Sequence, residues 1–294
     1  MSKKRRLISF DWAMKKLLRS KANFEILEGF LSELLKDDIH ILEILESEGN
    51  KENLRDKYNR VDLKVKNKKN EIIIIEVQYE RELDYLQRIL YGTSKVITEH
   101  IEESAPYSKI VKVISVNILY FDLGQGEDYV YHGSTTFKGI HSQDLLQLSE
   151  DQQEIYGGRP VSEIYPEYYL IKVNSFDDIA KDTLDEWIYF LKNEEIKEDF
   201  KAKGLKKAKQ ELDVLKLSQE ERMAYERYKD DLHYQASMVE STFTIGRIKG
   251  RKEGKKEKAV EIAISLISKN GMGPKMIADI TGLTEEEIKA LKPK

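Results

Sequence analysis

The sequence predicts an α/β protein with a mixed central sheet, in which helix, three strands, helix and strand follow in that order. Residues 60–66 alternate apolar and polar side chains, and a polar turn at 67–70 leads into the apolar run of 71–78, which together are typical of a β-hairpin. Residues 110–121 are rich in β-branched side chains, as in a buried strand. After about residue 174, strand signals vanish and charged helical segments follow. We therefore expect a first domain at 1–175 and a charged, all-helical C-terminal region at 176–294.

Helical spacing of apolar residues marks residues 10–35, where the polar stretch 20–23 should divide a short helix from a longer one. Asp11 stands where a helix N-cap would be. A strand-like stretch at 39–45 then leads to the hairpin. The other expected elements are a helix at 81–103, strands at 110–121, 129–137 and 168–173, and charged helices interrupted at Gly204, Gly246, Gly250 and Gly254.

Composition excludes several classes of protein. Of 294 residues, 40% are hydrophobic and 35% charged, so a core can form and global disorder is excluded. The net charge is only -4, so nucleic acid would have to be bound by local patches. The absence of cysteine excludes disulfides, thiolate zinc sites and cysteine nucleophiles. Because no stretch approaches the roughly 20 apolar residues of a membrane span, we expect a cytoplasmic protein without a membrane partner.

Two acidic residues of the hairpin are expected on one face of the sheet, because side chains alternate along a strand. If Asn67 pairs with Glu71 across an odd-numbered loop, Asp62 lies directly opposite Glu76, with Cβ atoms about 5 Å apart. An even-numbered loop would put the two acids on opposite faces. The apolar residues expected together on the other face are Val61, Leu63, Val65, Ile73, Ile75 and Val77.

Carboxylates this close repel each other unless a positive charge lies between them. An oxygen-binding ion such as Mg²⁺ or Mn²⁺ would provide that charge. The alternative is that Asp62 and Glu76 are solvent-facing residues of an antiparallel sheet. Acidic residues are disfavoured in strands, and Glu76 ends a run of four isoleucines, where a charge is costly without a purpose. The pattern alone leaves both interpretations open.

Several motifs occur in a characteristic order along the chain. They are FDWAMKKLL at 10–18, RVDLKVKN at 60–67, EIIIIEVQ at 71–78, LQRILYGTSKVI at 86–97, SVNILYFD at 115–122, YPEYYLIKV at 165–173 and the charged helical tail. This order resembles the PD-(D/E)XK nuclease core, and more closely its Rpn branch, the recombination-promoting nucleases also labelled putative transposases. The resemblance spans nearly the whole chain and implies a restriction-endonuclease-like αβββαβ core.

The resemblance implies roles for individual residues. Asp62 and Glu76 become the metal ligands, with the backbone carbonyl of Val77 as a third, and Mg²⁺ is the expected ion, with Mn²⁺ or Ca²⁺ as alternatives. Gln78 stands where the wider superfamily has lysine, and an amide can orient a water or donate to phosphate but carries no charge. Gln78, together with Lys64, would orient the attacking water.

Asp11 and Lys15 resemble the D-x-x-x-K of Rpn proteins, which implies that Asp11 lies near the metal. The alternative is that Asp11 only caps its helix. Arg88 and Tyr91, on the helix after the hairpin, could meet a phosphate backbone, although a solvated arginine and a packed tyrosine are the favoured explanations when each residue is taken singly.

The implied activity is that of a metal-dependent DNA endonuclease of low sequence specificity, linked to recombination or mobile elements. DNA is then the partner, and no small-molecule cofactor is expected. Cleavage of both strands by one site per chain would be simplest in a homodimer joined through the tail. The alternative is a catalytically silent nucleic-acid-binding or assembly protein, because the motif lysine is missing.

The tail contains two further features. Residues 246–258 carry seven basic and two acidic side chains, which would either neutralise phosphates or form a solvated helix face. The stretch 274–291 should form two short helices joined at Gly282, and Thr284 with Glu287 should form a capping box for the second helix.

Overall fold

The computed structural model describes residues 7–45, 61–102, 104–268 and 272–291. The chain divides into two compact units, Met1–Glu226 and Arg227–Lys294. The first contains a mixed sheet of strand order β1-β2-β3-β4-β6-β5, in which β3, β4 and β6 run parallel. This confirms the α/β class and the αβββαβ order. The strands are β1 (Ile41–Leu45), β2 (Leu63–Asn67), β3 (Ile72–Gln78), β4 (Val113–Leu119), β5 (Val130–Gly133) and β6 (Glu167–Lys172).

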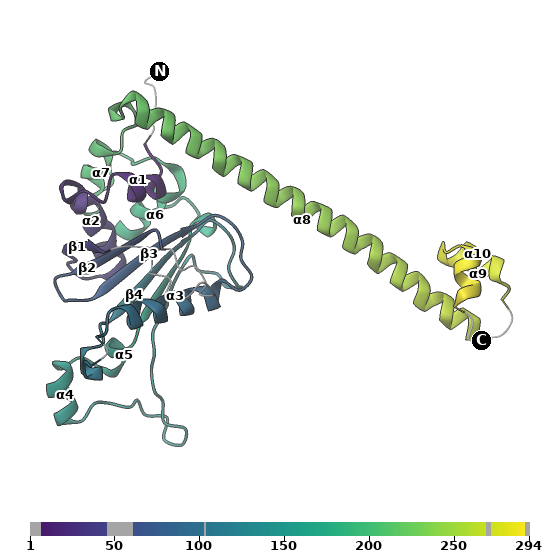
Figure 1. The fold of residues 1–294 in the computed structure, drawn as a ribbon, viewed down its shortest axis with the longest axis horizontal. Helices are drawn as coiled ribbons and strands as arrows, with labels where there is room; N and C mark the ends of the chain where they lie inside the picture. Colours follow the sequence, from purple (N-terminus) through teal and green to yellow (C-terminus); the bar gives the residue numbers. More distant parts are fainter. Residues whose placement is uncertain (1–6, 46–60, 103, 269–271, 292–294) are drawn as a thin grey trace. The chain divides into compact units, whose positions relative to one another are not determined.

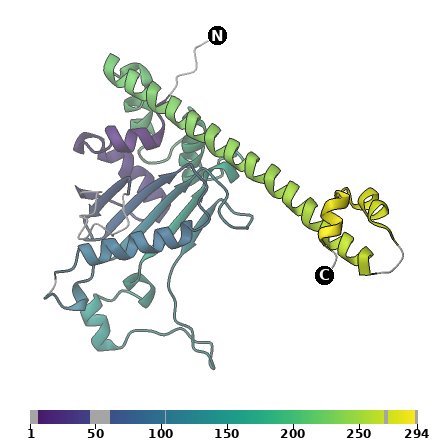
Figure 2. The same ribbon diagram turned by 45° about the vertical axis from the view of Figure 1, so that its right-hand side comes forward.

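Helices cover both faces of this sheet (Figures 1 and 2). One face carries α1 (Phe10–Lys16), α2 (Phe24–Leu35), α6 (Thr183–Asn193) and α7 (Leu205–Glu211), and the other carries α3 (Tyr85–Glu99). Every residue of β4 is buried as a result, which explains the continuous β-branched run in its sequence. Short 3-10 helices lie at Lys21–Asn23, Tyr107–Lys109, Val173–Ser175 and Val214–Lys216.

The hairpin turn is odd-numbered, as the metal-site hypothesis requires. The backbone N–H of Asn67 donates to the Glu71 carbonyl at 3.0 Å, and Leu63 pairs with Ile75. Asn70 adopts a φ of 63°, the left-handed conformation that closes a three-residue loop. The paired register covers Leu63–Lys66, and Asp62, at the bend directly before β2, lies close enough to Glu76 to help raise its pKa. The odd-numbered turn and the meeting of the two acids are therefore confirmed.

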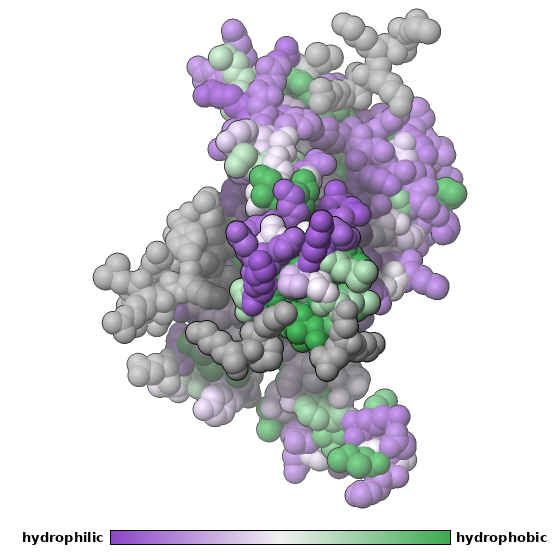
Figure 3. Space-filling view, turned by 90° about the vertical axis from the view of Figure 1, so that its right-hand side faces the viewer, coloured by the Kyte–Doolittle hydropathy of each residue, from purple (hydrophilic) through white to green (hydrophobic). Residues whose placement is uncertain are grey.

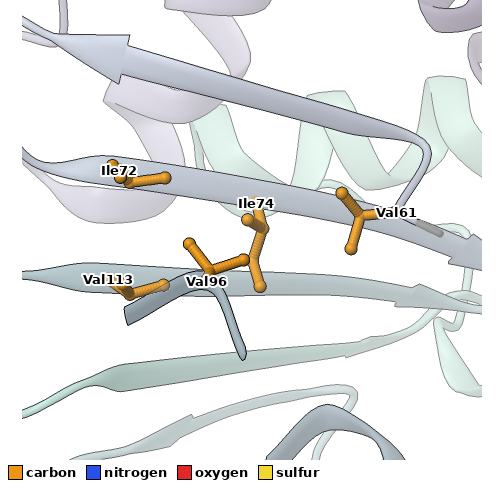
Figure 4. Packing of buried hydrophobic residues seen from close by; sticks show 5 residues of the cluster. All are labelled: Val61, Ile72, Ile74, Val96 and Val113. Carbon is orange, nitrogen blue, oxygen red and sulfur yellow. The ribbon is translucent and has the colours of Figure 1, made fainter. Parts of the chain in front are cut away.

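One part of the hairpin prediction is wrong. Val61 packs with Ile72 and Ile74 under α3, together with Val96 and Val113 (Figure 4). It therefore lies on the face opposite to the one predicted. The chain bends at Asp62 and β2 begins only at Leu63, so regular alternation does not extend back to Val61.

The first unit ends later than the boundary expected near residue 175. The indole ring of Trp187, in α6, is fully buried, with its centroid 6.0 Å from that of Phe10 and 5.6 Å from that of Phe30. The Tyr225 hydroxyl, near the start of α8, accepts a hydrogen bond from the Ser9 backbone N–H at 3.0 Å. A few buried aromatic side chains among many charged ones thus attach residues 176–226 to the first unit.

The connection between β5 and β6 extends away from the sheet (Figures 1 and 2). It contains α4 (Glu150–Tyr156) and α5 (Val161–Ile164), neither of which was expected, because neither buries a residue and so neither shows an apolar period. Ile140, Leu145 and Leu146 are exposed here. In Figure 3, hydrophobic side chains lie among hydrophilic ones in this segment, lowest in the view.

The second unit consists of most of α8 (Gln219–Ser268), α9 (Pro274–Thr281) and α10 (Glu285–Ala290). Gly282 is left-handed, and the capping box of Thr284 and Glu287 is present. This confirms the two short helices that were predicted for residues 274–291. The small core contains Ala263, Ile277, Leu283 and Ile288.

The predicted interruption at Gly204 is confirmed, because this residue is left-handed and is the N-cap of α7. The interruptions predicted at Gly246, Gly250 and Gly254 are wrong, because α8 continues through all three. A helix-interior glycine costs only about 1 kcal/mol relative to alanine, and the flanking lysines, arginines and glutamates are good helix formers. Within the described part of the chain, no helix is both long and apolar enough to span a membrane.

Candidate active site

The two predicted acids lie at the end of the hairpin away from its turn. Asp62 comes directly before β2, and Glu76 lies near the end of β3. Their side chains are 19% and 13% exposed. Asp62 Oδ2 accepts a hydrogen bond from the Val77 backbone N–H at 2.8 Å, which holds the Asp62 carboxylate against β3. The local register thus brings two partly desolvated acids to one point of the sheet.

The pKa of Glu76 is strongly perturbed. Burial raises its pKa to about 7, the Arg88 guanidinium opposes the rise, and the Asp62 and Glu82 carboxylates add to it. Glu76 and Glu82 both form ion pairs with Arg88. Because burial makes the carboxylate form of Glu76 unfavourable, a cation bound by both Glu76 and Asp62 would stabilise that carboxylate.

Asp11 and Lys15 reach the same place from α1. Lys15 Nζ lies 2.8 Å from Asp11 Oδ1 and 3.3 Å from Asp62 Oδ1. Burial by itself lowers the pKa of Lys15, but the two carboxylates raise it above its ordinary value. Ser9 holds the N-cap position and Asp11 lies within the first turn, so the interpretation of Asp11 as a helix cap is wrong. The buried Asp11 instead holds Lys15 beside Asp62.

Arg19 also reaches this site and was missed in the sequence. Its Nη2 donates to the Asp62 backbone carbonyl at 3.0 Å. Asp11 and Lys15 lie four residues apart in α1, the spacing that places side chains on one side of a helix. Arg19 lies in the turn after α1, so this spacing does not extend to it and no sequence pattern marked it.

Gln78 belongs to the same group of side chains but is turned towards a neighbouring loop. Its Nε2 donates to Glu82 Oε1 at 2.9 Å and to the Glu80 carbonyl at 3.3 Å. Glu82, which the sequence did not suggest, therefore links Gln78 to Arg88. Because Gln78 lies two residues after Glu76, both side chains belong to the same face of β3.

Lys64 lies apart from this group, contrary to the water-orienting role expected for it. Its Nζ is 3.4 Å from Glu99 Oε2, at the last residue of α3. Along the helix axis, Glu99 is about 16 Å from Arg88. Tyr91, on α3, is 42% exposed, so its side chain lies on the surface and outside the core.

The side chains present fit a hard divalent cation. Among the described residues, no three His, Cys, Asp or Glu side chains gather as a metal-binding group, so Asp62 and Glu76 would be the side-chain ligands. Mg²⁺ commonly takes one or two carboxylates and keeps several waters, and the Val77 carbonyl is the adjacent backbone oxygen. Lys15 forms an ion pair with Asp62, and Arg88 forms one with Glu76. A divalent ion would replace these two side chains as the positive charge beside the carboxylates.

A family model described as PD-(D/E)XK nuclease family transposase matches residues 8–242. The chain belongs to this family. The match includes nearly the whole first unit and the beginning of the second. No match was found among curated proteins or among solved structures. Membership confirms the nuclease fold predicted from the motif order, and Gln78 replaces the lysine for which the family is named.

Proposed function

We propose that this member of the PD-(D/E)XK nuclease family is a divalent-metal-dependent DNA endonuclease of low sequence specificity, linked to recombination or mobile elements. The observation that carries the proposal is the closeness of Asp62 to Glu76, two partly buried acids, of which Glu76 has its pKa raised to about 7. A structural role would not require two acids at a desolvated strand end. DNA is the proposed substrate, and the cytoplasm the proposed location.

Asp62, Glu76 and the Val77 carbonyl would hold the ion, for which Mg²⁺ is the first expectation and Mn²⁺ or Ca²⁺ the alternatives. When bound, such an ion supplies Lewis-acid polarisation of the phosphate and a lowered pKa of water. Gln78 would orient the attacking water or donate to a phosphate oxygen after leaving Glu82. Lys15 and Arg19 supply positive charge beside Asp62, which compensates for the lysine missing at position 78.

A catalytically silent, nucleic-acid-binding protein is the second candidate. It is favoured by the neutral Gln78 and by the ion pairs that Lys15 and Arg88 already make with the two acids. This candidate predicts salt-sensitive DNA binding, no nicking, and no heat on titration with divalent metal.

Cleavage of supercoiled plasmid tests the proposal. We expect nicked and linear products with Mg²⁺ or Mn²⁺ and none with EDTA. Asp62→Asn should reduce the rate by at least about 10²-fold, because it removes a charged ligand from the reacting centre. The matched control is Asp37→Asn, at a partly exposed acid paired with Lys69. Unchanged cleavage by Asp62→Asn would rule the site out.

Lys15→Met should separate metal binding from turnover. Removing the ammonium from Asp62 should tighten the metal Kd by about 2- to 5-fold, the range of a partly exposed ion pair. The cleavage rate at saturating metal should fall by about 10²-fold, because positive charge near the phosphate is lost. Calorimetric titration and single-turnover cleavage measure the two effects, with the neighbouring exposed Lys16→Met as control. Equal effects of both substitutions would contradict this role.

A further inference from the structure

The middle of α8 carries an apolar stripe that no described residue covers. Residues 233–258 are exposed throughout, except for the half-buried Thr244. Yet Tyr234, Met238, Ile245 and Ile248 are 67, 51, 65 and 50% exposed. Their spacing of four, seven and three residues follows the 3.5-residue period of helices that pair along their length. A helix that stays exposed on all sides carries polar side chains at such positions instead of apolar ones.

Three glycines lower the intrinsic helix propensity of this segment, although the charged residues around them are good helix formers. Gly246, Gly250 and Gly254 lie within it, and glycine is among the least favourable residues in a helix interior. A Cβ built at any of the three meets no atom within 4 Å, so no internal contact requires a glycine there. Most helical stability in proteins comes from packing an apolar face, and the uncovered stripe is the face available for such packing.

Charges on the two sides of the stripe are opposite at mirrored positions. Residues 229–231 read Lys-Asp-Asp and residues 251–253 read Arg-Lys-Glu. Reflected about Ser241, these become three pairs of opposite sign: 229 with 253, 230 with 252, and 231 with 251. The next pair outward, 228 with 254, is uncharged, and the one after it, 227 with 255, is like-charged. An antiparallel second copy brings the three opposite pairs together, whereas a parallel copy sets like charges against each other.

We propose that a second copy of this chain docks antiparallel on residues 229–253 of α8, with the two-fold axis near Ser241. Tyr234 then lies level with Ile248 of the other copy, and Met238 close to Ile245. The same patch serves both copies, as an isologous interface requires. The interface uses none of the metal-site residues, so it does not depend on whether the chain cuts DNA.

DNA is the other occupant that the basic residues 246–258 suggest. Two of these lysines already serve the chain itself: Lys256 pairs with Glu287 at 2.7 Å, and Lys258 with Glu261 at 2.7 Å. DNA would also leave the stripe of Tyr234, Met238, Ile245 and Ile248 uncovered. The second copy accounts for both the stripe and the charges.

Charge reversal in the full-length chain tests the interface, with the molar mass in solution as the readout. We expect a wild-type dimer. Asp230→Lys with Asp231→Lys, and separately Arg251→Asp with Lys252→Asp, should each weaken dimerisation by at least about 10-fold, because both ends of the interface then oppose like charges. Mixing the two variants, or combining all four substitutions in one chain, should restore the dimer. Asp279→Lys, an exposed acid of α9, is the matched control.

The absence of cysteine allows the orientation to be tested directly. Ser241→Cys should form an interchain disulfide on mild oxidation. Tyr234→Cys should not, because antiparallel pairing separates the two equivalent positions by about 21 Å. Crosslinking at position 234, or dimers unaffected by either double substitution, would overturn the antiparallel arrangement. A wild-type chain that stays monomeric at about 100 µM would overturn the interface itself, and if Arg251→Asp with Lys252→Asp then weakens only DNA binding, the basic residues form a nucleic-acid surface.

Discussion

Glu76→Gln should abolish cleavage and at the same time make the metal-free protein more stable above pH 7. The glutamate side chain is only 13% exposed, and burial raises its pKa to about 7. An amide has nearly the same shape but no charge to desolvate, and Arg88 keeps its second partner, Glu82. As a metal ligand, however, the amide lacks the charge that a divalent ion needs.

The sign of the pH effect follows from the two states of Glu76. In the unfolded chain its carboxyl releases the proton near pH 4.5, and in the folded chain near pH 7. Between these values the folded state binds more protons, so stability falls as the pH rises. Between pH values below 4.5 and values well above 7, this one group lowers the free energy of unfolding by about 3 kcal/mol. This part of the pH dependence should disappear in Glu76→Gln.

Urea unfolding in EDTA between pH 5 and pH 8 measures the stability effect, and plasmid cleavage the activity. We expect cleavage to fall by at least about 10³-fold, as when one member of a charged catalytic group is removed. Glu43→Gln, at an acid 56% exposed on β1, should change neither quantity. A substituted protein that cuts normally is incompatible with a ligand role. Parallel stability profiles of the two proteins would show instead that Glu76 ionises at its ordinary pH.

Trp187→Ala should destabilise the first unit by about 3–5 kcal/mol, the range for a large aromatic side chain removed from a core. The indole ring is fully buried against Phe10 of α1 and Phe30 of α2. Its Nε1 also donates to the Lys203 carbonyl at 3.1 Å. Because α1 carries Asp11 and Lys15, we expect cleavage to be lost at a lower temperature than in the wild type.

Two variants calibrate this result by equilibrium unfolding. Trp187→Phe keeps most of the ring and loses the hydrogen bond, so about 1–2 kcal/mol is expected. Ile179→Ala truncates a side chain that is 61% exposed and should cost less than about 0.5 kcal/mol. A fragment ending at residue 175 that unfolds with wild-type stability would contradict the inclusion of α6 in the first unit.

Local pattern was sufficient for the hairpin and the order of elements. The register depends on neighbouring residues only: alternation along β2 and β3, and a turn in which Asn70 tolerates a left-handed conformation. The same holds for the capping box of Thr284 and Glu287. These features involve residues close in sequence, so their chemistry can be seen without the fold. The predicted roles of Asp62, Glu76, Val77 and Gln78 in metal binding and catalysis await the experiments above.

Other features depend on contacts between distant segments. Lys64 and Arg19 have long side chains, and which carboxylate or carbonyl each reaches depends on how α3 and α1 lie on the sheet. Val61 lies on the face of the sheet opposite to the predicted one because the chain bends before β2. The end of the first unit was hidden because single aromatic residues, Trp187 and Tyr225, attach otherwise charged helices.

The sequence by itself determined the nuclease-type order of elements and, through the odd-numbered turn, the end of the hairpin at which Asp62 and Glu76 meet, because turn length is a local property. Only the tertiary structure decided which cations lie beside these acids. Lys15 and Arg88 come from helices on opposite faces of the sheet, and only packing brings their side chains to the same strand ends. Burial at that point also decided the raised pKa of Glu76, because desolvation is a property of the surroundings and not of the residue.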